Sequence, residues 1–355
     1  MSVQTVEKVG ARPAFHIGTF RIEPGARKTV DLPVSVLSDH TPAALSVHVV
    51  HGRKNGSTLF VSAAIHGDEV IGVEIVRRLL RSSSLKNMKG TLLAVPIVNS
   101  FGFMNHSRYL PDRRDLNRSF PGSATGSLAS RLAHIFMSEV VKRADVGIDL
   151  HSAAIHRTNL PQIRLTPSKP ETLELAEAFA APVTLISKIR PGSLREAAQE
   201  NGIDILLYEA GEGLRFDEFA VRAGVSGVLR VMRHLQMIPP KGVSNPKSRT
   251  IHARSSTWLR APAGGLLRTH KDIGEEVATG DLLGVISDPF GEIETEVLAE
   301  QSGLLIGRTH LPIVNEGDGL FHIAHIDRKV DAAARIDALT ADMEEDALLD
   351  EDEII

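Results

Sequence analysis

The sequence predicts an α/β protein with a mixed, largely parallel sheet flanked by helices, followed by a small β-sandwich. Three observations predict this fold class. From about Thr58 to Met237, continuous apolar runs alternate with helical stretches, which is typical of layered α/β domains. A stretch rich in Pro, Lys and Ser follows. The chain beyond it has Gly-centred turns at close intervals and little helical periodicity.

The first strand–helix–strand unit spans residues 58–99. Segments 58–65 and 91–99 are continuously apolar rather than alternating, as strands buried in a parallel sheet require. Between them lie apolar residues at helical spacing: Val70, Val73, Val76 and Leu80. The Val-, Thr- and Pro-rich segment before Thr58 predicts additional edge strands.

The same alternation continues toward residue 237. Segment 127–144 predicts a helix because Leu132, Ile135, Phe136 and Val140 fall on one face. Further strands are expected at 144–151, 181–187 and 202–211, with helices at 170–180 and 193–201.

Changes in composition suggest the domain organisation. We expect a catalytic α/β unit with N-terminal edge strands at 1–238, a linker at 239–254, a β-sandwich at 255–327 and an acidic tail at 328–355. Segments 264–287 and 302–324 resemble each other, which suggests two pseudo-symmetric halves of the sandwich. The acidic tail predicts a frayed helix or a disordered segment.

Composition excludes several classes of protein. The chain has 355 residues, 42% of them hydrophobic, and a net charge of −4, so nothing indicates nucleic-acid binding. No apolar run reaches membrane-spanning length, and the N-terminus lacks a secretory pattern. Cysteine is absent, so any metal must be held by His, Asp or Glu. These features favour a cytoplasmic protein that binds neither nucleic acid nor membrane.

Polar residues end the first predicted strand. His66 and Glu69 lie at its carboxyl end, where open α/β sheets bind their ligands, and both side chains are good zinc ligands. An alternative is purely structural. Glu69 would then begin the next helix and favour its dipole, while His66 would be a turn residue.

Two further strand ends carry the same kind of residue. His151 ends the strand expected at 144–151, and Asp149 precedes it on the same face as a possible hydrogen-bond partner for a zinc-bound histidine. Glu209 follows another buried run and is a candidate general base. The alternatives are an ordinary polar residue opening a loop for His151 and a loop acid for Glu209. Three protein ligands with a fourth position left for water are typical of catalytic zinc.

The segment 105–122, NHSRYLPDRRDLNRSFPG, is unusually rich in Arg and Asn. A guanidinium presents a planar fork that suits carboxylates and developing oxyanions. Asn117 and Arg118 are neighbours that could hold one carboxylate together. Solvated loop charge is the alternative reading of this segment.

Four motifs in this order, HGDE, RDLNRSFPG, DLHS and YEAGE, resemble the succinylglutamate desuccinylase/aspartoacylase family, relatives of the zinc carboxypeptidases. The resemblance covers about 58–237. It implies a zinc carboxypeptidase-like fold and one zinc ion per chain on His66, Glu69 and His151. It also implies Glu209 as the catalytic acid/base, and Asn117 and Arg118 as the clamp for the substrate carboxylate. Arg108 is implied as the oxyanion-stabilising arginine, with Arg113 as a competitor for that role.

The leading hypothesis is therefore a zinc-dependent amidohydrolase that removes an acyl group from an N-acyl amino acid or a close relative. The alternative is a zinc carboxypeptidase or amidase acting on short peptides, and a third class is a metal-free binding protein on the same scaffold. The sequence leaves open whether copies of the chain form a homo-oligomer.

The C-terminal repeat resembles the barrel-sandwich hybrid of biotinyl and lipoyl domains. The hairpin that carries the modified lysine in such carriers has the sequence DPFGEIE here, without a lysine. We therefore expect a structural domain that borders the active-site mouth, limits substrates to small molecules and contributes no zinc ligand.

Overall fold

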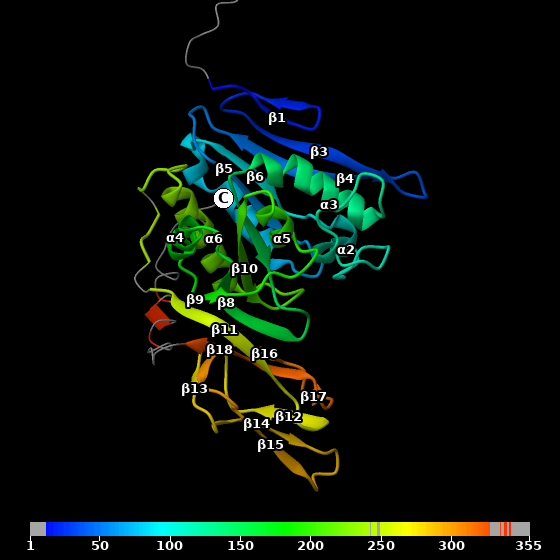
Figure 1. Ribbon diagram of the computed structural model, residues 1–355, viewed down its shortest axis with the longest axis vertical. Coiled ribbons are helices and arrows are strands. Elements are labelled where there is room, and N and C mark those ends of the chain that lie inside the picture. Colours follow the sequence, from blue (N-terminus) through cyan, green and yellow to red (C-terminus); the bar gives the residue numbers. More distant parts are fainter. Residues whose placement is uncertain are drawn as a thin grey trace, which may run out of the picture.

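The computed structural model describes residues 12–241, 243–246 and 249–326, together with residues 334, 337, 338 and 341. Apart from those four positions, the predicted acidic tail at 328–355 lies outside the described residues. In the described part of the chain, the main sheet has the strand order β13-β16-β18-β11-β9-β8-β10-β7-β5-β6-β4-β3. These strands follow one another along the long axis of the molecule (Figure 1).

The centre of this sheet is parallel and buried on both faces. Its strands are β5 (Thr58–Ala63), β6 (Thr91–Val95), β7 (Val146–His151) and β10 (Asp204–Gly211). They pair in parallel in the order β10-β7-β5-β6. The continuous apolar runs of the sequence are these strands, so the predicted mixed α/β class is confirmed.

Antiparallel strands extend the sheet beyond β6, as the sequence before Thr58 predicts. β3 (Arg27–Val36) pairs with β4 (Pro42–His51), and β4 pairs with β6. Two short strands, β1 (Phe15–Ile17) and β2 (Phe20–Ile22), form a separate hairpin.

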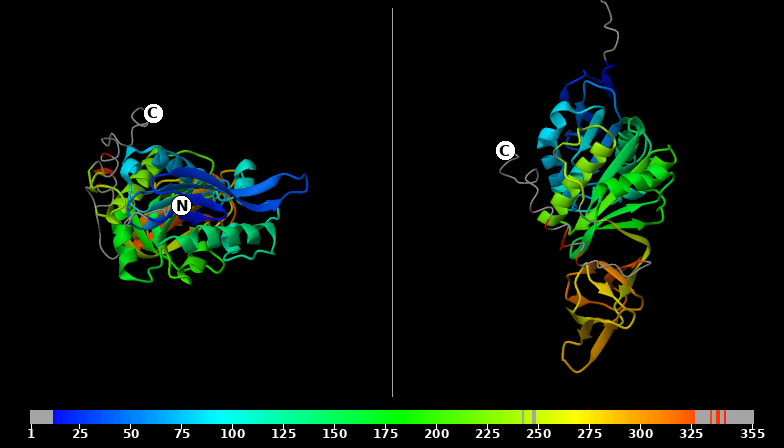
Figure 2. Two further views of the ribbon diagram at one scale, coloured as in Figure 1. Left: turned by 90° about the horizontal axis from the view of Figure 1, so that it is seen from above. Right: turned by 90° about the vertical axis from the view of Figure 1, so that its left-hand side faces the viewer.

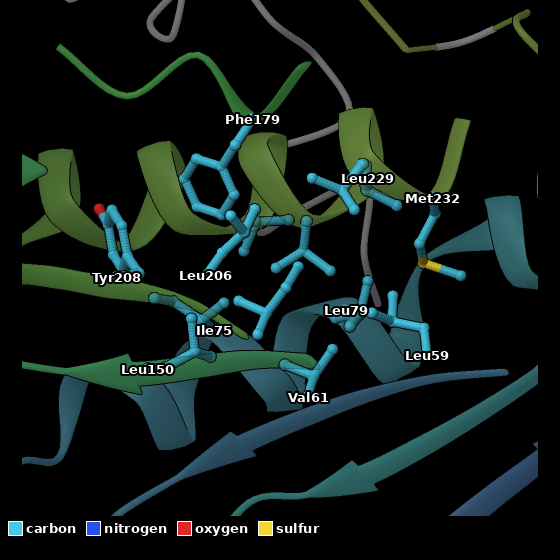
Figure 3. Packing of buried hydrophobic residues seen from close by; sticks show 14 of the residues in the cluster. Leu59, Val61, Ile75, Leu79, Leu150, Phe179, Leu206, Tyr208, Leu229 and Met232 are labelled. Carbon is cyan, nitrogen blue, oxygen red and sulfur yellow. The ribbon is translucent and has the colours of Figure 1, made fainter. Parts of the chain in front are cut away.

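Helices cover both faces of the sheet. One face carries α1 (Ile71–Arg81), α4 (Pro170–Phe179) and α6 (Glu218–His234), and the other carries α3 (Leu128–Glu139) and α5 (Leu194–Gln199). In Figure 3, Ile75 of α1, Phe179 of α4 and Leu229 of α6 pack over sheet residues. Shorter helical segments are α2 (Ser100–Met104) and the 3₁₀ turns Ser83–Asn87, Leu116–Arg118 and Val141–Arg143. None of the described helices has the length and apolar character needed to span a membrane.

A closed ring of strands joins the catalytic part of the sheet to the C-terminal part. Its members are β8 (Arg157–Leu165), β9 (Val183–Ile186), β11 (Ile251–Arg260), β16 (Gly303–Thr309) and β18 (Gly319–Ile326). Each pairs with the next in the order β8-β9-β11-β18-β16, and β16 pairs back with β8. β11 thus begins at Ile251, inside the segment 239–254 expected as a linker.

A small apolar cluster fills this ring. Its buried members come from all five strands: Leu160, Val183, Leu185, Ile251, Ala253, Leu304, Ile306 and Ala324. Because β8 and β9 share this cluster with β11, β16 and β18, the ring packs as one unit rather than as two domains joined by a tether.

The remaining C-terminal strands form a second sheet. Its order is β15-β14-β12-β17, with bounds Glu294–Leu298, Leu282–Ser287, Gly265–Thr269 and Ile313–Val314. The short β13 (Glu276–Val277) pairs with β16. A core that includes Leu267, Ile286 and Phe321 draws residues from both sheets. Figure 2 shows this part extending as a narrower body beyond the helix-covered sheet.

Candidate active site

The three predicted metal ligands meet at the carboxyl edge of the parallel sheet. His66 and Glu69 lie in the turn between β5 and α1, and His151 is the last residue of β7. β5 and β7 are parallel neighbours with Ser62 opposite Asp149, so their carboxyl ends lie together. One ligand atom from each of the three residues lies within 4.8 Å of the others, and all three side chains are buried.

Close packing fixes the turn that carries His66 and Glu69. A Cβ atom at Gly67 would lie 1.9 Å from the carbonyl carbon of Gly102 in α2. Only glycine allows these two backbone segments to approach so closely. The glycine of the HGDE motif therefore determines where the two ligand side chains begin.

Both histidines face the same carboxylate with the same ring atom. The Nδ1 atom of His66 lies 2.7 Å from Glu69 Oε1, and Nδ1 of His151 lies 2.6 Å from Glu69 Oε2. The Nε2 atoms point the other way, to Asp115 Oδ1 at 3.1 Å and to Asp149 Oδ2 at 2.7 Å. Each ring is thus placed between two carboxylates.

This donor set fits a divalent metal. A neutral histidine at a zinc site usually donates one ring N–H to a carboxylate and offers the lone pair of its other nitrogen to the ion. Here Nε2 would donate and Nδ1 would be the ligand atom. Without a cation, both buried rings would have to be protonated to face two carboxylates each. Burial opposes that charge, but Asp149 and Glu69 outweigh it and raise the pKa of His151 well above its usual value.

Further hydrogen bonds hold the two carboxylates that face the Nε2 atoms of these histidines. Asp149, fully buried, accepts a hydrogen bond from Ser62 Oγ at 2.8 Å through the carboxylate oxygen that does not face His151. Asp115 accepts from Arg108 Nε and Nη2 at 3.2 and 3.0 Å. Arg108 Nη1 also lies 3.5 Å from Glu69 Oε1, which places this guanidinium at the metal site.

Glu209 lies near the end of β10, directly beside His151 in the parallel ladder with β7. Two residues of β8 bind its carboxylate. Asn159 Nδ2 donates to Oε2 at 2.9 Å, and Arg164 Nη1 donates to Oε1 at 3.2 Å. The predicted general base therefore reaches the same cavity as the metal ligands.

Asn117 and Arg118 form part of a 3₁₀ turn on the rim of this cavity. Asn117 Oδ1 accepts from the backbone N–H of Leu194 at 2.9 Å, and this contact anchors the start of α5. Arg118 Nη1 donates to the carbonyl of Asn117 at 2.5 Å. Both residues line the cavity, as does Arg108, whereas Arg113 is exposed and does not line it.

The cavity has a volume of about 270 Å³ and is rich in arginine. Six arginines of the described residues line it: Arg108, Arg118, Arg157, Arg164, Arg190 and Arg195. Burial, reinforced by neighbouring Arg164, lowers the pKa of Arg195 to about 10. Trp258 of β11 also lines the cavity, so the C-terminal part borders it. Four of these guanidiniums, those of residues 118, 157, 190 and 195, pair with no carboxylate in the described part of the chain.

Sequence reasoning missed the residues of β8, of the segment before α5 and of the first turn of α5. Asn159 and Arg164 contact Glu209, and Arg190 and Arg195 line the cavity, but none of them belongs to a compact motif. A weak signal is present in segment 157–164, RTNLPQIR, where two arginines, Asn and Gln lie together shortly after His151.

Comparisons with known proteins agree with this geometry. Residues 55–235 match the model of the succinylglutamate desuccinylase/aspartoacylase catalytic domain. The chain is 26% identical over 308 residues to an N-alpha-acetyl-L-2,4-diaminobutyric acid deacetylase from Halomonas elongata, covering 83% of this chain and 90% of that one. It is 29% identical to a succinylglutamate desuccinylase from Pseudomonas aeruginosa, over 49% of this chain and 57% of that enzyme.

A solved structure shares the fold. The crystal structure of a succinylglutamate desuccinylase/aspartoacylase from Rhodobacter sphaeroides aligns with a TM-score of 0.75 at 25% identity. The alignment covers 86% of this chain and 96% of that one, so the likeness extends through the C-terminal strands as well as the catalytic part.

Proposed function

Because the chain belongs to the succinylglutamate desuccinylase/aspartoacylase family, we propose that it is a zinc-dependent amidohydrolase that removes an acyl group from an N-acyl amino acid or a close relative. The observation that carries the proposal is one cavity lined by His66, Glu69 and His151 together with Glu209 and Arg108. The names of the two curated relatives, a deacetylase and a desuccinylase, support acyl removal.

The residues of the cavity divide the reaction between them. Zinc held by the His66–Glu69–His151 set would supply a Lewis acid and lower the pKa of a coordinated water molecule. Glu209 would accept a proton from the attacking water and then donate it to the departing amine nitrogen. Arg108 would stabilise the negative charge that develops on the amide oxygen, an interaction worth about 3–4 kcal/mol for a well-placed donor.

The size of the cavity supports a small substrate over a peptide. Its volume of about 270 Å³ is just below the usual range of ligand pockets, roughly 300–1,000 Å³. Trp258 limits it on the side of the C-terminal strands. A short peptide would need a longer groove, so this small volume favours an N-acyl amino acid.

The charge of the cavity supports an anionic substrate. Asn117 and Arg118 would hold the α-carboxylate of the amino acid. Arg157, Arg190 and Arg195 line the same cavity, and no carboxylate of the described residues neutralises them. A second carboxylate on the substrate would offset the positive charge of these arginines, whereas an amine would add to it.

A substrate panel with metal analysis tests the proposal. The purified protein should contain one zinc ion per chain and release amine from N-acetyl, N-succinyl or N-formyl amino acids, faster than it cleaves dipeptides. In Glu209→Gln the side chain keeps its size but cannot accept a proton, so zinc should remain while kcat falls by roughly 10²–10⁴. Undiminished turnover in excess chelator, or full activity of the metal-loaded variant, would refute the proposed mechanism.

A further inference from the structure

The carboxylate of Glu209 is held at both oxygens by one strand. Asn159 and Arg164 of β8 bind Oε2 and Oε1, respectively. These residues are five positions apart and would face opposite sides of a regular strand. The register between β8 and β10 shifts by one residue between Glu209 and Gly211, and this irregularity brings both side chains to one carboxylate.

Strand β16 of the C-terminal part lies against the other edge of β8 (Figure 1). Gly307 pairs directly with Asn159 in this antiparallel contact. A Cβ atom at Gly307 would lie 2.7 Å from Asn159 Oδ1 and 3.1 Å from the carbonyl oxygen of Thr158. The side chain of Asn159 therefore occupies the space that any residue larger than glycine would take.

The second contact to Glu209 also leads back to β16. Gln162, fully buried, donates from Nε2 to the carbonyl of Ile306 at 3.3 Å. Its Oε1 accepts from Arg164 Nε at 3.2 Å, and the same guanidinium reaches Glu209. A buried amide thus links the backbone of β16 to the arginine that holds Oε1.

β16 is well placed to fix these contacts. It pairs with β18 along most of its length and contributes Leu304 and Ile306 to the apolar cluster of the five-stranded ring. A strand that is hydrogen-bonded on both edges and buried in a packed core moves little, because shifting it would open both ladders and the core.

We propose that β16 positions the acid/base Glu209 through two routes, Gly307 against Asn159 and the Ile306 carbonyl through Gln162 and Arg164. The inference rests on the proposed role of Glu209 in catalysis. Asn159, Gln162 and Gly307 are then positioning residues, and the C-terminal strands take part in the chemistry without supplying a catalytic group. Misplacing a reacting group by about 1 Å costs on the order of 10²-fold in rate.

A pair of glycine variants tests the contact across the two strands. Gly307→Ala pushes a methyl group against Asn159, so kcat should fall by roughly 10-fold or more while KM changes by less than about threefold. Gly264→Ala is the matched control in the same part of the chain, because its Cβ would lie 3.6 Å from the carbonyl oxygen of Val314, an ordinary contact distance, and its φ lies outside the left-handed region. It should keep wild-type kcat. Equal kcat in the two variants, with zinc content retained, would overturn the inference.

A double-mutant cycle separates positioning from general damage. Asn159→Ala should lower kcat by roughly 10- to 100-fold in the wild-type background. In the Glu209→Gln background it should lower kcat by less than about twofold, because Asn159 then has no acid/base carboxylate to position. Equal losses in both backgrounds would mean that Asn159 acts elsewhere, which overturns the inference.

The same measurements distinguish this inference from the proposed function. If Glu209→Gln loses activity while Asn159→Ala and Gln162→Leu keep wild-type kcat, the positioning role is wrong and the proposed function stands. If Glu209→Gln keeps wild-type activity, the proposed acid/base role of Glu209 and the positioning role are both wrong. Zinc content and the melting temperature of each variant show that the protein is folded and loaded.

Discussion

Replacing Asp149 by Asn should weaken zinc binding by 10- to 100-fold while leaving the fold intact. Asp149 is 1% exposed, and its oxygens lie 2.7 Å from His151 Nε2 and 2.8 Å from Ser62 Oγ. The amide of Asn has the same shape. Its oxygen can still accept the His151 proton, and Ser62 can turn to accept from its NH₂ group. The change therefore removes the negative charge and keeps the hydrogen bonds.

The magnitude follows from that lost charge. A hydrogen bond to a charged group contributes about 1.5–3 kcal/mol and a neutral one about 1 kcal/mol. The difference, about 0.5–2 kcal/mol, overlaps the 10- to 100-fold loss typical when the partner of a metal-bound histidine is changed, which is about 1.4–2.8 kcal/mol.

Competition with a chromophoric chelator measures the zinc affinity, and the melting temperature of the metal-free protein reports the fold. Ser62→Ala is the control, since it leaves the charge of Asp149 in place and should weaken zinc binding by less than tenfold. Wild-type zinc affinity in Asp149→Asn would refute the reasoning, because His151 would then not depend on the charge behind it.

Four further outcomes are expected. Arg118→Gln should raise KM for substrates with an α-carboxylate and leave KM for their carboxamides nearly unchanged, whereas equal effects would mean a structural role. His66→Ala should lose both zinc and activity while circular dichroism stays that of the wild type. Ending the chain at residue 250 should prevent cooperative folding, because it exposes Leu160, Val183 and Leu185. Each exposed side chain costs about 1.5–3 kcal/mol of unfolding free energy, against a total of about 5–15 kcal/mol for a typical domain. A sharp thermal transition of the truncated protein would contradict this. Burial, with Arg164 adding to it, lowers the pKa of His322 to about 3, so the unfolded chain binds more protons below pH 6.5. Stability should therefore fall by about 2 kcal/mol at pH 5 from this group alone, and His322→Phe should remove that part of the pH dependence.

The candidate metal ligands could be predicted from the sequence because they lie at or just after the ends of buried strands. An apolar run that stops at a polar residue marks a strand end, and parallel strands bring those ends to one edge of the sheet. His66 and His151 are 85 residues apart, yet β5 and β7 are neighbours, so both rings reach Glu69. Local pattern and general topology indicate these donor positions, and the resemblance of the four motifs to a known family implies the full set.

Strand β8 could not be predicted in the same way. Its sequence, RTNLPQIRL, is polar and contains Pro161, which argues against a strand inside a sheet. The structure accommodates the proline because β8 pairs with β16 through 157–159 and with β9 through 162–165. Pro161 lies between these two ladders. Such a gap depends on strands far away in the sequence, so the local sequence gives only a weak indication of where Asn159 and Arg164 lie.

The composition of the chain changes near residue 240, but strands from the two sides of this position pair with one another. The sequence changes character there, and the expectation of a separate cap follows naturally from that change. Pairing of Ile251 with Val183 carries the main sheet across the boundary, and β16 then returns to the edge of β8. The contacts that hold Glu209 therefore depend on strands from both sides of the boundary. A substitution in β16 that leaves every cavity residue intact should, for this reason, alter turnover rather than substrate affinity.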